Sequence, residues 1–130
     1  MKIRLTSLFV DNQDKAAQFY TEKLGFNVKM NMEMGEFKFI TLVSGEEPDG
    51  PELLLEPNSS EEASTYQRGI YAKGIPAMAL MADDVFAEYE RLNALGVKFK
   101  SEPNNNGFVI EVVLDDTCGN WIQLYQPLAQ

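Results

Sequence analysis

The chain has 130 residues, which is the length of one ordinary domain or of two small modules that share one core. It contains no histidine and one cysteine, which excludes a Ser-His-Asp triad, a Cys-His pair, histidine-based zinc or iron sites and an internal disulfide. Its 20 Asp+Glu outnumber its 11 Lys+Arg, for a net charge of −9 at pH 7. This balance argues against nucleic-acid binding, which needs a basic face, and would attract a cationic ligand.

The cellular location follows from hydrophobic patterning. No segment approaches the run of about 20 apolar residues that a membrane span needs. Residues 1–12 alternate between apolar and polar types and carry charges, unlike a signal peptide. We therefore expect a cytoplasmic protein with no membrane partner.

The first part of the chain predicts a strand, a helix and three more strands. Alternation marks the strands, an Asp or Asn cap begins the helix, and Gly25 ends it. A polar loop rich in turn formers, SGEEPDGP, precedes the last strand, which Pro57 closes. These elements are expected at residues 2–10, 11–24, 26–32, 36–43 and 53–55.

After a connector at residues 58–75, which carries a short helix, the same pattern begins again. Asp83 or Asp84 caps the second helix and Gly96 ends it, while EPNNNG is expected to be a loop. The elements of this second part are expected at residues 76–82, 83–95, 97–100, 108–114 and 121–125.

The two parts match in spacing, which indicates an internal duplication. Asp11 precedes Gly25 by 14 residues and Asp83 precedes Gly96 by 13, and both helices end in Leu-Gly. The sequence therefore predicts one α+β domain over residues 1–130, made of two tandem βαβββ modules at 1–57 and 76–128. Their uncovered sheet faces are expected to enclose a shared cavity, which is the natural binding site.

Three phrases carry a family resemblance that covers residues 1–128. LFVDNQDKAAQFYTEKLGFNV, MALMADDVFAEYERLNALGVKF and DDTCGNWIQLYQP resemble the signatures of the vicinal oxygen chelate superfamily, which includes glyoxalase I, extradiol dioxygenases, fosfomycin-resistance enzymes and bleomycin-resistance proteins. The resemblance implies a curved mixed sheet around the cavity, the glyoxalase/bleomycin-resistance fold, and a homodimer.

The resemblance also locates the four positions where metal-dependent members carry His, Gln or Glu ligands. Here they hold Leu5, Leu53, Ala77 and Gln123, and the first-module register could shift by one residue to Leu54. Leu and Ala offer no lone pair, and one neutral amide cannot hold a divalent cation against water. We therefore expect no metal and no other cofactor, which argues against glyoxalase and dioxygenase activity.

Strand alternation nominates the ligand-pocket residues, for which ordinary core packing is the alternative. They are Ser7, Phe9, Phe39, Met81, Trp121, Gln123 and Tyr125. Glu111 is the one acidic residue in a strongly apolar strand, so it either faces solvent or serves as a pocket carboxylate. If the protein is a catalyst, Glu111 and Tyr125 are the candidate acid–base residues.

Three functions remain open at this point. The first is a metal-free protein that binds, and so sequesters, a small drug or metabolite of cationic or aromatic character. The second is a metal-independent lyase or isomerase that uses Glu111 and Tyr125. The third is a regulatory or structural dimer whose cavity is filled by Leu53, Leu55, Met81 and Trp121.

Overall fold

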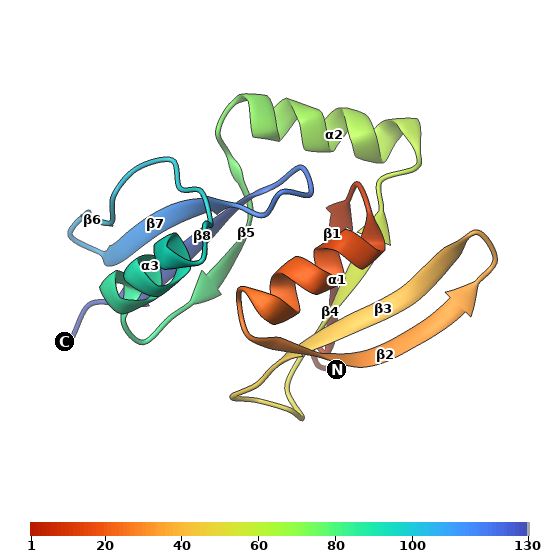
Figure 1. Cartoon of the computed structure of the whole chain (residues 1–130), viewed down its shortest axis with the longest axis horizontal. Coiled ribbons are helices and arrows are strands. Elements are labelled where there is room, and N and C mark those ends of the chain that lie inside the picture. Colours follow the sequence, from red (N-terminus) through yellow and green to blue (C-terminus); the bar gives the residue numbers. More distant parts are fainter. Residues whose placement is uncertain (130) are drawn as a thin grey trace. The chain divides into compact units, whose positions relative to one another are not determined.

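The computed structural model describes residues 1–129 and contains, within them, two four-stranded mixed sheets and three helices (Figure 1). This confirms the predicted α+β class and the two tandem βαβββ modules. Contacts divide the chain into Met1–Gln67 and Arg68–Gln130, and the division falls inside the expected connector at 58–75. The shared cavity and the module boundaries at 57 and 76 stay predictions.

The first unit is built on a sheet with the strand order β1-β4-β3-β2, in which β1 and β4 are parallel and the other pairs are antiparallel. Its helix begins after Asn12, whose side chain accepts a hydrogen bond from the backbone N–H of Lys15 at 3.0 Å. The elements are β1 (Leu5–Val10), α1 (Gln13–Glu22), β2 (Phe26–Met34), β3 (Phe37–Ser44) and β4 (Glu52–Pro57).

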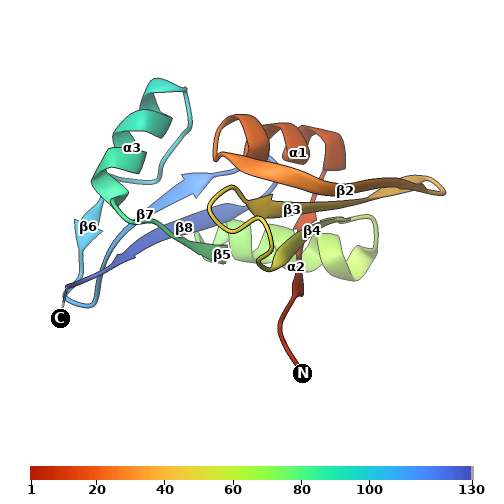
Figure 2. The same cartoon turned by 90° about the horizontal axis from the view of Figure 1, so that it is seen from below.

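Helix α1 covers one face of this sheet (Figure 2). Its buried residues Ala16, Phe19 and Tyr20 follow helical spacing. Ile40, Leu42 and Leu55, three sheet side chains that alternate toward α1, are fully buried. We call the opposite side, which α1 does not cover, the far face of the first sheet.

A β-bulge reverses the alternation of β2. Val28 pairs with Leu42, but Met30 pairs with Thr41, so Lys29 is one extra residue in this strand. Before the bulge, Phe26 lies on the α1 side, where its ring contacts that of Tyr20. After it, every second residue from Met30 lies on the far face.

The second unit repeats the plan with the strand order β5-β8-β7-β6. Helix α3 is capped by Asp84, which accepts from the backbone N–H of Ala87 at 3.0 Å, and it buries Val85 and Leu92. The side of this sheet opposite α3 is called the far face of the second sheet. The remaining elements are α2 (Glu61–Ala72), β5 (Pro76–Met81), α3 (Val85–Ala94), β6 (Asn104–Asn105), β7 (Val109–Asp115) and β8 (Trp121–Pro127).

The first strand after α3 differs from the prediction. Residues 97–100 form no strand but one isolated bridge, between Phe99 and Leu114. The short strand β6 lies instead within EPNNNG, which the sequence predicted to be a loop. Pro103 has no N–H to donate to a ladder, and Asn105 and Asn106 cap the following turn by accepting from backbone N–H groups.

The length and hydropathy of the helices in residues 1–129 bear on whether a helix could span a membrane. None of the helices described there is both long and apolar enough to cross a bilayer.

Candidate functional site

The far face of the first sheet holds the predicted pocket residues Ser7, Phe9 and Phe39. Ser7 pairs with Leu54, which in turn pairs with Thr41, two residues along β3 from Phe39. Alternation therefore places these side chains on one surface, on the side opposite α1.

Carboxylates lie among these apolar side chains. The hydroxyl of Thr41, which is fully buried, donates to Oε1 of Glu52 at 2.7 Å. Glu56 lies four residues after Glu52 in β4, so it occupies the same face, and it pairs with Phe9 of β1. Neither carboxylate forms a salt bridge with a Lys or Arg among residues 1–129, so this face has negative charge to offer to a ligand.

The far face of the second sheet brings together four of the predicted residues. Gln123 donates from Nε2 to Oε2 of Glu111 at 3.3 Å, and Asn106 donates to the same oxygen at 2.7 Å. Tyr125 is the register partner of both Glu111 and Met81, whose side chain is 62% exposed. Glu111 is therefore a half-buried carboxylate that two amides orient, on a surface with an aromatic ring and a thioether.

Trp121 has partners within its own unit. Its ring stacks on Tyr71 of α2 with centroids 4.9 Å apart, and its Nε1 donates to the Tyr71 carbonyl at 3.0 Å. Lys100 Nζ lies 5.4 Å from the centroid of the same indole. This predicted pocket residue therefore fastens the C-terminal end of α2 to the sheet.

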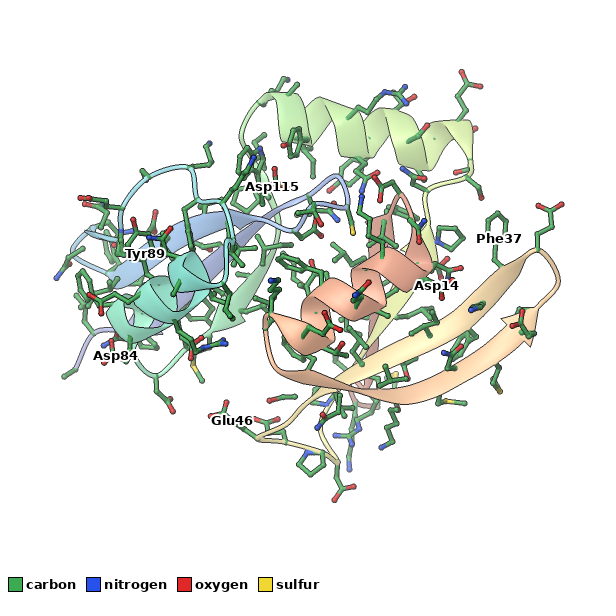
Figure 3. The ribbon with its side chains drawn as sticks, in the orientation of Figure 1. Asp14, Phe37, Glu46, Asp84, Tyr89 and Asp115 are labelled. Carbon is green, nitrogen blue, oxygen red and sulfur yellow. The ribbon has the colours of Figure 1, made fainter. Side chains whose placement is uncertain are left out.

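Tyr71, which stacks on Trp121, has a perturbed pKa. The hydroxyl of Tyr71 donates to Oδ2 of Asp115 at 2.7 Å, close to the C-terminal end of α2 (Figure 3). This hydrogen bond is the main cause that raises the pKa of Tyr71, with smaller contributions from desolvation and from the charges of Asp115 and Asp116.

Residues that the sequence analysis did not nominate also lie on the first far face. They are Met30, Met32 and Met34 of β2, with exposed fractions of 38, 44 and 59%. Phe37 of β3, which is 38% exposed and was expected beside Phe39 in the pocket wall, lies next to them. The signal was the alternating stretch MNMEM at residues 30–34. Its face could not be assigned without knowing that Lys29 is bulged.

The four family metal positions do not form a donor set. Leu53 pairs with Thr6 and points to the α1 side, so of the two candidate positions in β4 it is Leu54 that shares the far face with Leu5. Ala77 lies at an irregularity of β5, and the Gln123 amide is hydrogen bonded to Glu111. Nowhere in residues 1–129 do three His, Cys, Asp or Glu side chains gather as metal ligands. A divalent cation does not fit the residues present at these positions.

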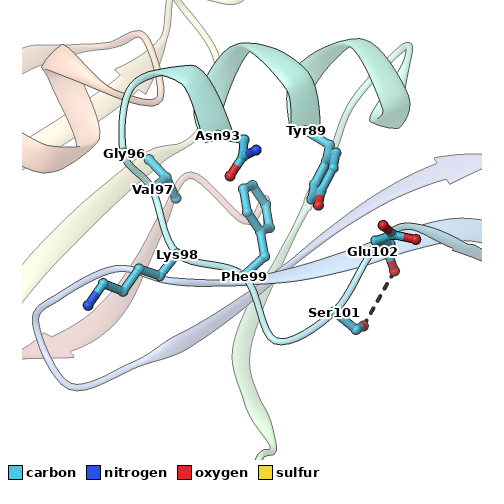
Figure 4. Close-up of a pocket in the computed structure, with 8 residues that line it drawn as sticks. All are labelled: Tyr89, Asn93, Gly96, Val97, Lys98, Phe99, Ser101 and Glu102. Carbon is cyan, nitrogen blue, oxygen red and sulfur yellow. Dashed lines mark hydrogen bonds between the residues drawn. The ribbon is translucent and has the colours of Figure 1, made fainter.

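A pocket of about 530 Å³ lies elsewhere, between α3 and the segment that follows it (Figure 4). None of the predicted site residues lines it. Its lining consists of Tyr89, Asn93, Gly96, Val97, Lys98, Phe99, Ser101 and Glu102.

Comparisons with known proteins agree with this architecture. Residues 2–124 match the family model described as the Glyoxalase/Bleomycin resistance protein/Dioxygenase superfamily. The chain is 52% identical over 126 residues to the Bacillus subtilis (strain 168) protein YurT, which covers 97% of this chain and 99% of the relative.

Two solved structures extend the comparison. UcmS2 is 36% identical, with a TM-score of 0.81 over 96% of this chain and 97% of its own. TnmS3, an antibiotic binding protein from Streptomyces sp. CB03234, shares the fold at 24% identity, with a TM-score of 0.75 over 98% and 97%. The chain belongs to the glyoxalase/bleomycin resistance protein/dioxygenase superfamily.

Proposed function

We propose that this protein binds, and thereby sequesters, a small organic molecule that has an aromatic or apolar body and a positive charge, and that it does so without a metal ion. One observation carries the proposal. The far face of the first sheet combines exposed methionine and phenylalanine side chains with the carboxylate of Glu52, which no Lys or Arg among residues 1–129 neutralises.

The physical reason lies in what such a surface stabilises. Apolar side chains bury a flat organic body by the hydrophobic effect, and a carboxylate among them attracts a cation more strongly than it would in bulk water. The net charge of −9 adds a long-range attraction for cations. The far face of the second sheet has a similar composition, in Glu111, Tyr125 and Met81.

The comparisons support small-molecule binding. A shared fold does not pass on a ligand. TnmS3 adds that a protein of this fold is described as binding an antibiotic. We extend the proposal to a homodimer in the cytoplasm, in line with the family resemblance and the sequence composition.

The test is a titration with two aromatic probes of opposite charge, ethidium (cationic) and 8-anilino-1-naphthalenesulfonate (anionic). Isothermal titration calorimetry measures the Kd of each probe. We expect saturable ethidium binding with a Kd of about 1–100 μM and at least about tenfold weaker binding of the anion. The substitution Glu52→Gln keeps an oxygen for Thr41 but removes the charge, and it should weaken ethidium binding about three- to tenfold.

The matched control is Glu46→Gln, which removes one negative charge from an exposed residue of the loop between β3 and β4, outside the sheet (Figure 3). It should leave the ethidium Kd within about twofold of wild type, because an exposed charge is screened by salt. The absence of saturable ethidium binding below about 1 mM, or equally tight binding of the anion, would contradict the proposal.

A further inference from the structure

The three methionines of β2 form a ladder on the far face of the first sheet. Met30, Met32 and Met34 pair with Thr41, Phe39 and Phe37, and alternation puts all six side chains on the same side. The bulge at Lys29 is what aims them there, since the strand would otherwise turn this set of side chains toward α1.

The outer part of the ladder lies on a two-stranded arm. Strand β3 pairs with β2 along its whole length, but with β4 only from Ile40 to Leu42. Phe37 therefore lies near the tip of the β2–β3 hairpin, beyond the cover of β4 (Figure 3). A two-stranded arm gains little stability from its own pairing, and an apolar face left open on it adds none until something binds there. An exposed apolar face of this kind is typical of a binding surface.

The opposite side of the arm is polar and already has a partner. Lys38 alternates to the α1 side, where its Nζ lies 3.0 Å from Oδ1 of Asp14. The backbone of Lys38 is also held, because Gln13 donates to its carbonyl at 2.6 Å and accepts from its N–H at 3.0 Å. The arm is thus anchored to α1 by one face and presents the ladder on the other.

The chemistry of the ladder suits a flat aromatic ligand. Methionine is unbranched and polarizable, adapts to irregular shapes, and makes favourable contacts between sulfur and aromatic rings. The inner end of the ladder, Met30, pairs with Thr41, whose hydroxyl holds the Glu52 carboxylate. An aromatic cation could therefore rest on the thioethers with its charge directed at Glu52.

We infer that Met30, Met32 and Met34 are the specificity-determining residues of the ligand surface, and that they select cations with a flat aromatic body over aliphatic cations of the same charge. This inference rests on the proposed function, and it names the aromatic ligand as the occupant of this face. Because thioether side chains can repack, the ladder accepts aromatic bodies of differing outline.

The test compares two neighbouring positions of β2 that alternate to opposite faces. Met32→Thr removes the middle of the ladder, whereas Asn31→Thr introduces the same residue on the α1 side. We expect Met32→Thr to weaken ethidium binding about fivefold, and Asn31→Thr to change it by less than about twofold. Binding of tetrapropylammonium, an aliphatic cation, should be weaker than that of ethidium and equal in the two variants.

A second measurement does not depend on mutation. In protein labelled with 13C at the methionine methyl groups, saturating ethidium should shift the resonances of Met30, Met32 and Met34, because an aromatic ring stacked on them changes their local field. The resonance of Met1, at the exposed N-terminus, is the internal control. Circular dichroism and unfolding midpoints establish that both variants fold.

The outcomes separate this inference from the proposed function. If wild-type protein binds ethidium but Met32→Thr leaves the Kd unchanged and the ladder methyl resonances do not move, the inference is overturned and the proposed function stands. If wild-type protein does not bind ethidium, both fail. A change in molecular mass of Met32→Thr by light scattering, with unchanged ethidium affinity, would instead identify the ladder as a contact between copies of the chain and would overturn the inference.

Discussion

Gln13 is a buried polar residue that connects α1 to two strands. Its Nε2 donates to the carbonyls of Lys38 and Leu55, at 2.6 and 2.8 Å, and its Oε1 accepts from the N–H of Lys38. Every polar atom of the side chain therefore has a partner, which is what burial of an amide requires. The sequence places Gln13 in a helix, but it could not indicate that these partners lie 25 and 42 residues away.

Tyr71 gives a prediction at the same scale. The hydrogen bond to Asp115 raises its folded-state pKa above the unfolded value of about 10. Its stabilising contribution is therefore fully present below about pH 10 and is lost as the pH rises through the folded pKa, where a tyrosinate would face a carboxylate. In urea unfolding between about pH 8 and 12, wild-type stability should fall more steeply than that of Tyr71→Phe.

The control for this prediction is Tyr66→Phe, which changes a tyrosine of the same helix whose side chain is 58% exposed. That variant should follow the wild-type pH dependence. At neutral pH, Tyr71→Phe should cost about 1 kcal/mol, because it keeps the stack on Trp121 and loses only the hydrogen bond. Parallel loss of stability in wild type and Tyr71→Phe above about pH 10 would contradict the assignment.

At the scale of elements, caps and glycine stops in the sequence were enough to predict the two helices that cover the sheets. Caps expected at Asp11 or Asn12 and at Asp83 or Asp84, with glycine stops at Gly25 and Gly96, predicted α1 and α3 closely, because capping and positive φ are properties of a few consecutive residues. The structure decides for Asn12 and Asp84. The strand expected at 97–100 was wrong. A segment of four residues forms a strand only if a neighbouring strand pairs with it along its length, and the sequence of the segment does not determine this. Here Phe99 alone forms a bridge, with Leu114 of β7.

The bulge in β2 provides a prediction for an element. Deletion of Lys29 forces one half of the strand out of phase, so either Phe26 leaves α1 or the ladder residues turn toward it. We expect a loss of about 2 kcal/mol or more in the free energy of unfolding, comparable to the removal of a large core side chain. Denaturant unfolding measures this loss.

The matched variant is Lys29→Ala, which keeps the extra residue and removes only an exposed side chain. It should change the free energy of unfolding by less than about 0.5 kcal/mol. Equal stability of the deletion and the wild type would mean that the register can slip without cost, and that the bulge does not define the ladder.

For the whole molecule, the side chains available as metal ligands limit the chemistry that this fold can perform here. The chain has no histidine, and three of its four family metal positions are Leu or Ala in either register of β4. The far faces are instead supplied with apolar side chains and with carboxylates that are separated along their strands, such as Glu52 and Glu56. Binding by burial and charge attraction suits this inventory better than Lewis-acid catalysis.

Elemental analysis tests this point on protein purified without a chelator. We expect far less than one equivalent of iron, zinc, nickel or manganese per chain, because the donors at these positions cannot outcompete water for a divalent cation. Treatment with EDTA should leave ethidium affinity unchanged. A content of about one metal per chain that EDTA removes together with ethidium binding would refute metal-free binding.

The sequence by itself determined the two-module α+β fold, the helices and most strands, the family, and the residues that stand at the four family metal positions, because periodicity, caps, an internal duplication and residue identity are all readable locally or by counting. Only the tertiary structure decided which side chains share a surface. The bulge at Lys29 brought the methionines to the far face, and Trp121 found a stacking partner 50 residues away in Tyr71. Both depend on strand register and on contacts distant in sequence, which are set by the packing of a whole sheet and not by any short segment.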